Sequence, residues 1–112
     1  MSKIVVVFVN CASRQEATDI AEQVLGQRLA ASANIYPEIT SSYWWNGRIE
    51  SRSEHPLVLK TTDGLVAELS DLVEGLHSYD TAGIVAVPAE HMNARYDTWL
   101  QAEVDSGAGK TR

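Results

Sequence analysis

The chain has 112 residues, a formal net charge of −6 and an apolar share of 45%. This size fits one domain, and the acidic balance argues against a nucleic-acid-binding surface and against docking on anionic lipid. A single cysteine, Cys11, excludes an internal disulfide framework and is typical of a reducing compartment. The first apolar run, residues 4–9, is too short for a signal peptide or a membrane span, so we expect a cytoplasmic protein.

The N-terminal third predicts a strand, a helix and a second strand. The continuous β-branched run at residues 4–9 is typical of a strand buried on both faces. Ser13 followed three residues later by Glu16 is a capping box, and the apolar residues after it repeat at helical spacing as far as Gly26, a natural helix end. Residues 29–36 then predict a second strand that is rich in small side chains.

The most informative stretch is an aromatic-rich hairpin around Asn46-Gly47. Asn-Gly between two extended runs predicts a two-residue type I′ turn, which needs positive φ at both positions. This turn sets three cross-strand pairs, which are Trp45 with Arg48, Trp44 with Ile49 and Tyr43 with Glu50. Large rings then lie on both faces of a narrow ribbon, and a free two-stranded ribbon is marginal in water. We therefore expect the body of the domain or a second copy to cover it.

The remainder predicts strand, helix, strand and helix. Pro56 is expected to break the return leg of the hairpin, after which residues 57–59 re-enter a core. An apolar stripe at residues 65–76 predicts a second helix, and residues 84–87 form a short apolar strand. A third helix follows Asn93, with Tyr96, Trp99 and Leu100 as its buried face.

The last residues carry no periodicity. We expect one domain over residues 1–105 and a flexible tail over residues 106–112. The tail contains Gly-Lys-Thr, the end of a phosphate-binding motif. The motif is not complete, because Val104 stands at the position where its first glycine is required.

This order of elements predicts an α+β fold, a ferredoxin-like βαββαβ sandwich with an extra C-terminal helix and a long β-hairpin. In that fold the two helices cover one face of the sheet only. The runs at residues 4–9 and 84–87 are nevertheless apolar on both faces. A bare apolar face exceeds what monomers tolerate, so we expect sister subunits to bury it.

Several motifs together resemble the CutA family, the divalent-cation tolerance proteins. The resemblance runs from Ile4 to about Val104, and the hairpin followed by Leu-Lys-Thr-Thr is its most specific part. The segments that carry it are Leu-Ala-Ala-Ser-Ala-Asn-Ile at 29–35, Ser-Tyr-Trp-Trp-Asn-Gly-Arg-Ile-Glu at 42–50, Leu-Lys-Thr-Thr at 59–62, Leu-His-Ser-Tyr-Asp at 76–80 and Tyr-Asp-Thr-Trp-Leu at 96–100.

The resemblance implies a homotrimer whose long hairpin, including Tyr43, Trp44, Trp45 and Arg48, pairs with neighbouring subunits. It also implies tolerance to divalent metals, with copper(II) binding in some members. Structurally the family is similar to the trimeric P-II regulatory proteins. An alternative function is therefore a P-II-like trimer that binds a small effector or a protein partner in the cleft between subunits, and Lys60 is the candidate residue for that cleft.

His77 is the leading candidate metal ligand, because it stands at the loop histidine of the family and imidazole suits copper and zinc. The structural alternative is a loop histidine that hydrogen-bonds backbone. Asp80 beside it is a weaker candidate ligand, and Cys11 is expected to be a buried, inert thiol. The family's second histidine and a further cysteine are replaced here by Leu76 and Ser32, so metal binding should be modest. The sequence shows no nucleophile–base pair, and we do not expect an enzyme.

Overall fold

The computed structural model describes residues 2–104, so the predicted tail at residues 106–112 lies outside the described part of the chain. Over that range the fold is α+β, with five strands, three α-helices and one short 3-10 helix. In chain order the elements are β1 (Ile4–Cys11), α1 (Arg14–Gly26), β2 (Ser32–Ile35), β3 (Ile39–Trp45), β4 (Arg48–Thr62), η1 (Asp63–Leu65), α2 (Val66–Leu76), β5 (Ile84–Pro88) and α3 (Ala94–Val104).

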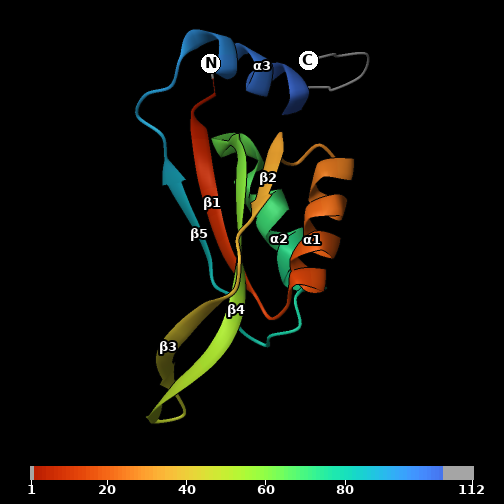
Figure 1. Ribbon diagram of the computed structural model, residues 1–112. Coiled ribbons are helices and arrows are strands. Elements are labelled where there is room, and N and C mark those ends of the chain that lie inside the picture. Colours follow the sequence, from red (N-terminus) through yellow and green to blue (C-terminus); the bar gives the residue numbers. More distant parts are fainter. Residues whose placement is uncertain (1, 105–112) are drawn as a thin grey trace.

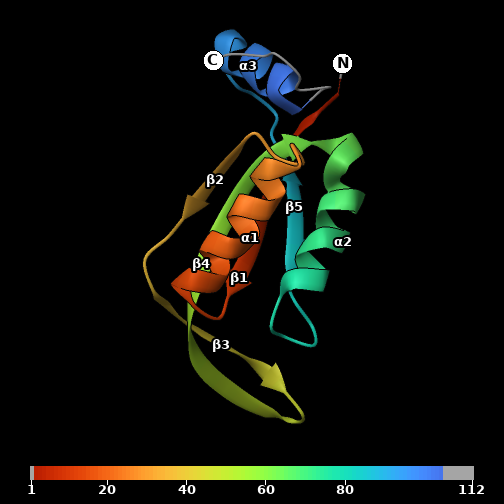
Figure 2. The same cartoon turned by 90° about the vertical axis from the view of Figure 1, so that its right-hand side faces the viewer.

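All strand pairs are antiparallel, and the main sheet has the order β2-β4-β1-β5. The first half of β4 extends beyond this sheet and pairs with β3 to form the long hairpin. Helices α1 and α2 lie side by side on one face of the sheet, and the hairpin projects away from the body of the molecule (Figure 1). Figure 2, turned by 90°, shows both helices in front of the strands and α3 across the opposite end from the hairpin.

The main core lies between the sheet and the two helices. Strand side chains alternate between the faces, so Val7 and Val9 of β1 share the helix side with Leu57 and Leu59, to which they are paired. All four are almost fully buried. They pack with the buried stripe of α1 and with Leu69 and Val73 of α2, as the apolar periodicity predicts, together with others of the same cluster such as Ala17, Ile20, Ala21 and Val24.

The opposite face of the sheet is bare in the single chain. Phe8 of β1 lies beside Val85 of β5, and Val6 beside Val87. The exposed fractions of Phe8, Val85 and Val87 are 47%, 58% and 45%. The predicted apolar, uncovered face is therefore present, and its burial by sister subunits remains a prediction.

A second, smaller core holds α3 against the start of β1. Leu100 and Val104 are buried with Ile4, and Tyr96 and Trp99 pack against this cluster. The predicted buried face of the third helix is confirmed for Leu100. Tyr96 and Trp99 are only partly buried.

The end of α1 differs from the prediction. Gly26 is still helical, and the left-handed residue is Arg28, with a φ of 56°. The N–H of Leu29 donates to the carbonyl of Val24 and that of Arg28 to the carbonyl of Leu25, which is a Schellman motif. The C-cap of the helix is Gln27, and the motif engages the N–H of buried Leu29 two residues later, so the second strand begins at residue 32 and not at 29.

The hairpin forms as predicted. Asn46 and Gly47 both have positive φ, 51° and 82°. The three cross-strand pairs of Tyr43, Trp44 and Trp45 with residues 50, 49 and 48 are those expected from the two-residue turn.

The expectation that Pro56 breaks the return strand is wrong. β4 runs through Pro56 without interruption, from Arg48 to Thr62. The carbonyl of Pro56 accepts the N–H of Tyr36, so its edge of the strand faces the connection between β2 and β3. In a strand the N and C=O of one residue point the same way. The missing donor of Pro56 therefore falls where β4 changes partner from β3 to β2, and it removes no ladder bond.

Two glycines give stability changes of opposite sign. Gly47→Ala should lower the free energy of unfolding by about 1 kcal/mol, because φ at this position is left-handed and a Cβ makes that region costly. Gly75→Ala should raise it by about 0.5 kcal/mol, because this helical position has open space and alanine is the better helix former. Urea unfolding of both variants measures the two shifts, and shifts of the same sign would contradict this backbone description.

Candidate functional site

His77 lies directly after α2 and caps it, its N–H donating to the carbonyl of Val73. The imidazole is buried, and both ring nitrogens are engaged. Nδ1 accepts the N–H of Tyr79 at 3.1 Å, so this nitrogen carries no proton. Nε2 then carries the proton and donates it to the carbonyl of Asn10 at 2.8 Å. The ring is thereby fixed in one tautomer and one orientation.

Glu16, in the first turn of α1, ties three segments together. One carboxylate oxygen accepts the N–H of Ala12 and the other that of Ser78, each at 2.7 Å. The backbone N–H of Glu16 donates to Oγ of Ser13, as the capping box predicts. The carboxylate of Glu16 accepts from the N–H of Ala12, and not from that of Ser13 as in a standard capping box. Burial opposes the charge, but these backbone donors and nearby His77 outweigh it and hold the pKa of Glu16 below its usual range.

Cys11 ends β1 and is fully buried. Burial, with the nearby carboxylates of Glu16 and Glu54, raises the pKa of its thiol to about 12. The side chain is therefore a protonated thiol at neutral pH. A metal that binds it as thiolate must displace that proton.

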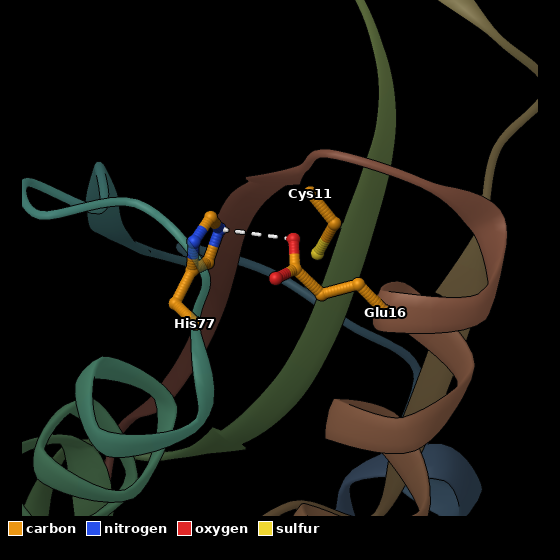
Figure 3. Close-up of side chains that lie close together, drawn as sticks. All are labelled: Cys11, Glu16 and His77. Atoms are coloured by element: carbon orange, nitrogen blue, oxygen red, sulfur yellow. Dashed lines mark ion pairs between the residues drawn. The ribbon is translucent and has the colours of Figure 1, made fainter.

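These three side chains converge, as Figure 3 shows, from the end of β1, the start of α1 and the residue after α2. Their nearest ligand-type atoms all lie within 4.8 Å of one another. Nε2 of His77 is 3.8 Å from Oε2 of Glu16, which is too long for a hydrogen bond. The cluster offers nitrogen, sulfur and oxygen ligands, a set that suits copper or zinc. Each potential ligand atom already takes part in a hydrogen bond or, in the thiol of Cys11, carries a proton. Metal binding therefore requires local rearrangement.

The structure brings His77 together with residues that the sequence did not group with it. Asp80, the other predicted ligand, is exposed and lines a separate cavity to which Cys11, Glu16 and His77 do not contribute. Glu16 was recognised only as a helix-capping residue, and no spacing in the sequence ties it to Ser78. Cys11 was recognised as buried, which is confirmed.

The hairpin residues divide between two environments. Tyr43 and Trp45 line the same cavity as Asp80. Trp44 faces solvent, with 71% of its surface exposed, and Arg48 is exposed as well. Nζ of Lys60 lies 3.4 Å from Oδ1 of Asn34 and does not line that cavity.

Replacement of Glu16 by glutamine tests its role in joining these segments. Because the folded-state pKa is depressed, the charged carboxylate stabilises the fold above about pH 4.5, and this contribution is lost as pH falls through the folded pKa. Glu16→Gln should cost about 1–2 kcal/mol of unfolding free energy at pH 7, and less below pH 4.5. Urea unfolding at several pH values measures this, with exposed Glu22→Gln on the same helix as control. A difference from wild type that does not change with pH would contradict it.

Known proteins with similar sequences point to one family. The family model described as "CutA1 divalent ion tolerance protein" matches residues 5–103. Human Protein CutA is 40% identical over 99 residues, which cover 88% of this chain and 55% of that protein. The divalent-cation tolerance protein CutA of Archaeoglobus fulgidus is 36% identical over 88% of this chain and 96% of its own length. The chain thus spans about half the length of its mammalian relatives and nearly all of the archaeal one.

Solved structures agree. The periplasmic divalent cation tolerance protein CutA from Archaeoglobus fulgidus superposes with a TM-score of 0.89 at 34% identity, covering 91% of this chain and 99% of that one. The Thermus thermophilus divalent cation tolerance protein gives a TM-score of 0.85 at 37% identity, covering 87% of this chain and 94% of that one. Within residues 2–104 no helix has the length and apolar character needed to cross a membrane. Fold, motif content and sequence similarity over most of its length therefore establish that this chain belongs to the CutA1 divalent-ion tolerance family.

Proposed function

We propose that this protein acts in the response to divalent metal ions as a homotrimer, and that it binds copper(II) at the cluster of Cys11, Glu16 and His77. The observation that carries the metal site is the convergence of these three side chains within 4.8 Å. The names of the family and of its archaeal relative, which speak of divalent-cation tolerance, support the functional class.

The hydrogen bonds of the cluster argue for weak binding. His77 must give up its bond to Asn10 before Nε2 can act as a ligand. The carboxylate of Glu16 must leave at least one of its two backbone donors, and Cys11 must lose its proton. Each step opposes binding, so affinity should be modest despite the suitable donor set.

Anaerobic calorimetric titration with copper(II) tests this site. Wild type should bind saturably near one ion per chain, and Cys11→Ala and His77→Gln should each weaken binding by about tenfold or more. His91→Ala, which removes an exposed histidine, is the matched control and should change nothing. Binding that persists in both cluster variants, or no binding by wild type, would contradict the proposed site.

The trimer is supported by two uncovered surfaces on the same molecule. The first is the bare sheet face of Phe8, Val85 and Val87, and the second is the outer face of the hairpin, where Trp44 and Ile49 are 71% and 64% exposed. Different patches that cover one another make a heterologous contact, and such a contact forms a closed ring of three when the rotation from one subunit to the next is one third of a turn. The strand order β2-β4-β1-β5 supports the ferredoxin-like topology, in which one sheet face is free for such assembly.

Sedimentation equilibrium tests the assembly. Wild type should sediment near 37 kDa, the mass of three chains of 12.3 kDa, and Val85→Glu should dissociate towards the mass of one chain. The substitution places a charge on an exposed position of the single chain, so it should leave the fold itself intact. Leu25→Glu, at an exposed apolar position on α1, should remain trimeric. A wild-type protein that stays at 12.3 kDa when dilute would refute the trimer.

We also propose a cytoplasmic, non-catalytic role. The raised pKa of Cys11 makes its thiol a poor nucleophile, which supports a role in binding over one in catalysis. A single, buried and unpaired cysteine supports a reducing compartment.

A further inference from the structure

A fourth potential metal ligand stands directly across the sheet from Cys11. In the pairing of β1 with β4, the partner of Cys11 is His55. Figure 3 shows β4, the green strand, passing close beside Cys11. Directly opposite residues of an antiparallel pair point to the same face, with Cβ atoms about 4.5–5.5 Å apart. His55 is therefore a neighbour of the metal cluster, although it is not among the side chains whose ligand atoms lie within 4.8 Å of one another.

The face on which His55 lies is the one that the helices cover. Alternate residues of a strand share a face, so His55 lies on the same side as Leu57 and Leu59, which are buried in the core formed with α1 and α2. The exposed apolar face, with Phe8 and Val85, is the opposite one. Assembly on that opposite face therefore leaves the surroundings of His55 and Cys11 unchanged.

One nitrogen of His55 lacks the partner that its burial requires. Nδ1 is covered by the chain itself, and within residues 2–104 no hydrogen bond is made to it. A buried polar atom without a partner is rare in native structures and calls for an explanation. Because its own chain already covers this atom, a sister subunit cannot supply the missing contact. The partner must be small enough to enter the fold, which leaves a water molecule or a metal ion.

Nδ1 of His55 is also the ligand atom with the least to give up. His77 must break its bond to Asn10 before Nε2 can bind a metal, and Glu16 must release a backbone donor. Nδ1 of His55 has no hydrogen bond to lose, and a neutral imidazole with its proton on Nε2 presents a free lone pair there. A water molecule would satisfy His55 alone, whereas a metal ion also uses the adjacent thiol, carboxylate and imidazole.

The cross-strand spacing suits chelation of one ion by Cys11 and His55. Metal–sulfur and metal–nitrogen bonds of about 2.3 and 2.0–2.1 Å at a tetrahedral angle hold Sγ and Nδ1 about 3.5 Å apart. Opposite side chains whose Cβ atoms are about 5 Å apart reach this separation by rotation about χ1 alone. No movement of either strand is needed.

We propose that His55 is the fourth ligand of the copper site, bound through Nδ1 beside Cys11, Glu16 and His77. This inference rests on the proposed function and completes its ligand set, which becomes two imidazoles, one thiolate and one carboxylate. The thiol proton of Cys11 passes to solvent when the metal binds. Four such ligands suit copper and zinc, whereas magnesium and calcium prefer oxygen ligands alone. The completed site therefore selects the softer divalent ions.

Pulsed electron paramagnetic resonance of the copper(II) protein tests this ligand directly, because the remote nitrogen of each bound imidazole gives a signal that can be counted. Anaerobic protein is frozen directly after copper(II) is added, so that the thiol does not reduce the ion. Wild type should show two imidazoles per copper ion. His55→Gln and His77→Gln should each show one, and the control His91→Gln, at an exposed position, should show two.

Calorimetry and cobalt(II) spectroscopy give two further readouts. His55→Gln should weaken copper(II) binding by about tenfold or more, while His91→Gln should bind like wild type. Cobalt(II), which a thiol does not reduce, absorbs strongly in the visible range when four-coordinate. His55→Gln should lose that intensity but keep the thiolate charge-transfer band of Cys11. His55→Cys, kept reduced, should restore the visible bands, because a second thiolate replaces the imidazole.

The folding of the variants is checked separately. Far-UV circular dichroism and urea unfolding show whether His55→Gln and His55→Cys are folded. The imidazole count of the wild-type protein needs no substitution, so it decides the question even if neither variant folds.

A wild-type count of one imidazole would overturn the four-ligand set. If that imidazole is lost in His77→Gln and kept in His55→Gln, His55 is not a ligand, its Nδ1 is hydrated, and the copper site of Cys11, Glu16 and His77 stands. If it is lost in His55→Gln instead, His77 is not a ligand. Wild-type protein that binds no copper(II) saturably would overturn the proposed function itself, which is a different result from either count.

Discussion

The backbone pairing of β4 constrains every other part of this molecule. Along one edge the strand pairs with β1, and along the other it pairs first with β3 and then with β2. Its register therefore decides which residues of β1 and β2 face the helices, and which residues of β3 share a face of the hairpin. A shift of one residue would turn Leu57 and Leu59 towards the bare face and remove them from the core.

Two features hold this register. The Asn46-Gly47 turn fixes the pairing at the tip of the hairpin, and Leu57 and Leu59 fix it in the core, at the other end of the same strand. Pro56 stands between them, at the point where the partner changes. The strand can therefore serve the body of the domain and the projecting ribbon without a break.

Much of the fold could be predicted from the sequence because the signals are local. Helical spacing located α1 and α2, and the Asn-Gly turn gave the hairpin its register. The errors came where a distant contact decides the outcome. Arg28 adopts the left-handed conformation and its guanidinium pairs with Glu103 of α3, at 2.9 Å, and nothing near Gly26 in the sequence indicates that contact.

The candidate site was less predictable for the same reason. His77 could be proposed from its motif, but its neighbours come from the ends of β1 and α1, which only the folded chain brings to that loop. The three-residue segment from His77 to Tyr79 also lies between the cluster of Cys11, Glu16 and His77 and the cavity that Tyr79 lines. Its backbone bonds Glu16 and His77, while the Tyr79 hydroxyl bonds Glu54 in the cavity. No sequence spacing encodes that arrangement.

The strand order has a further consequence for how the chain folds. The partner of Cys11 is His55, and every other residue of β1 pairs still further along the chain, with β4 or β5. Such non-local pairing gives a high contact order and slow folding, whereas the β3–β4 hairpin can close within about 1–10 μs. During synthesis the apolar segment Ile4–Cys11 is made before β4 and β5, with which it pairs, so it finds its partners late. The N-terminal strand is consequently the segment most exposed to aggregation in the nascent chain, and the one for which shielding by a chaperone would matter most.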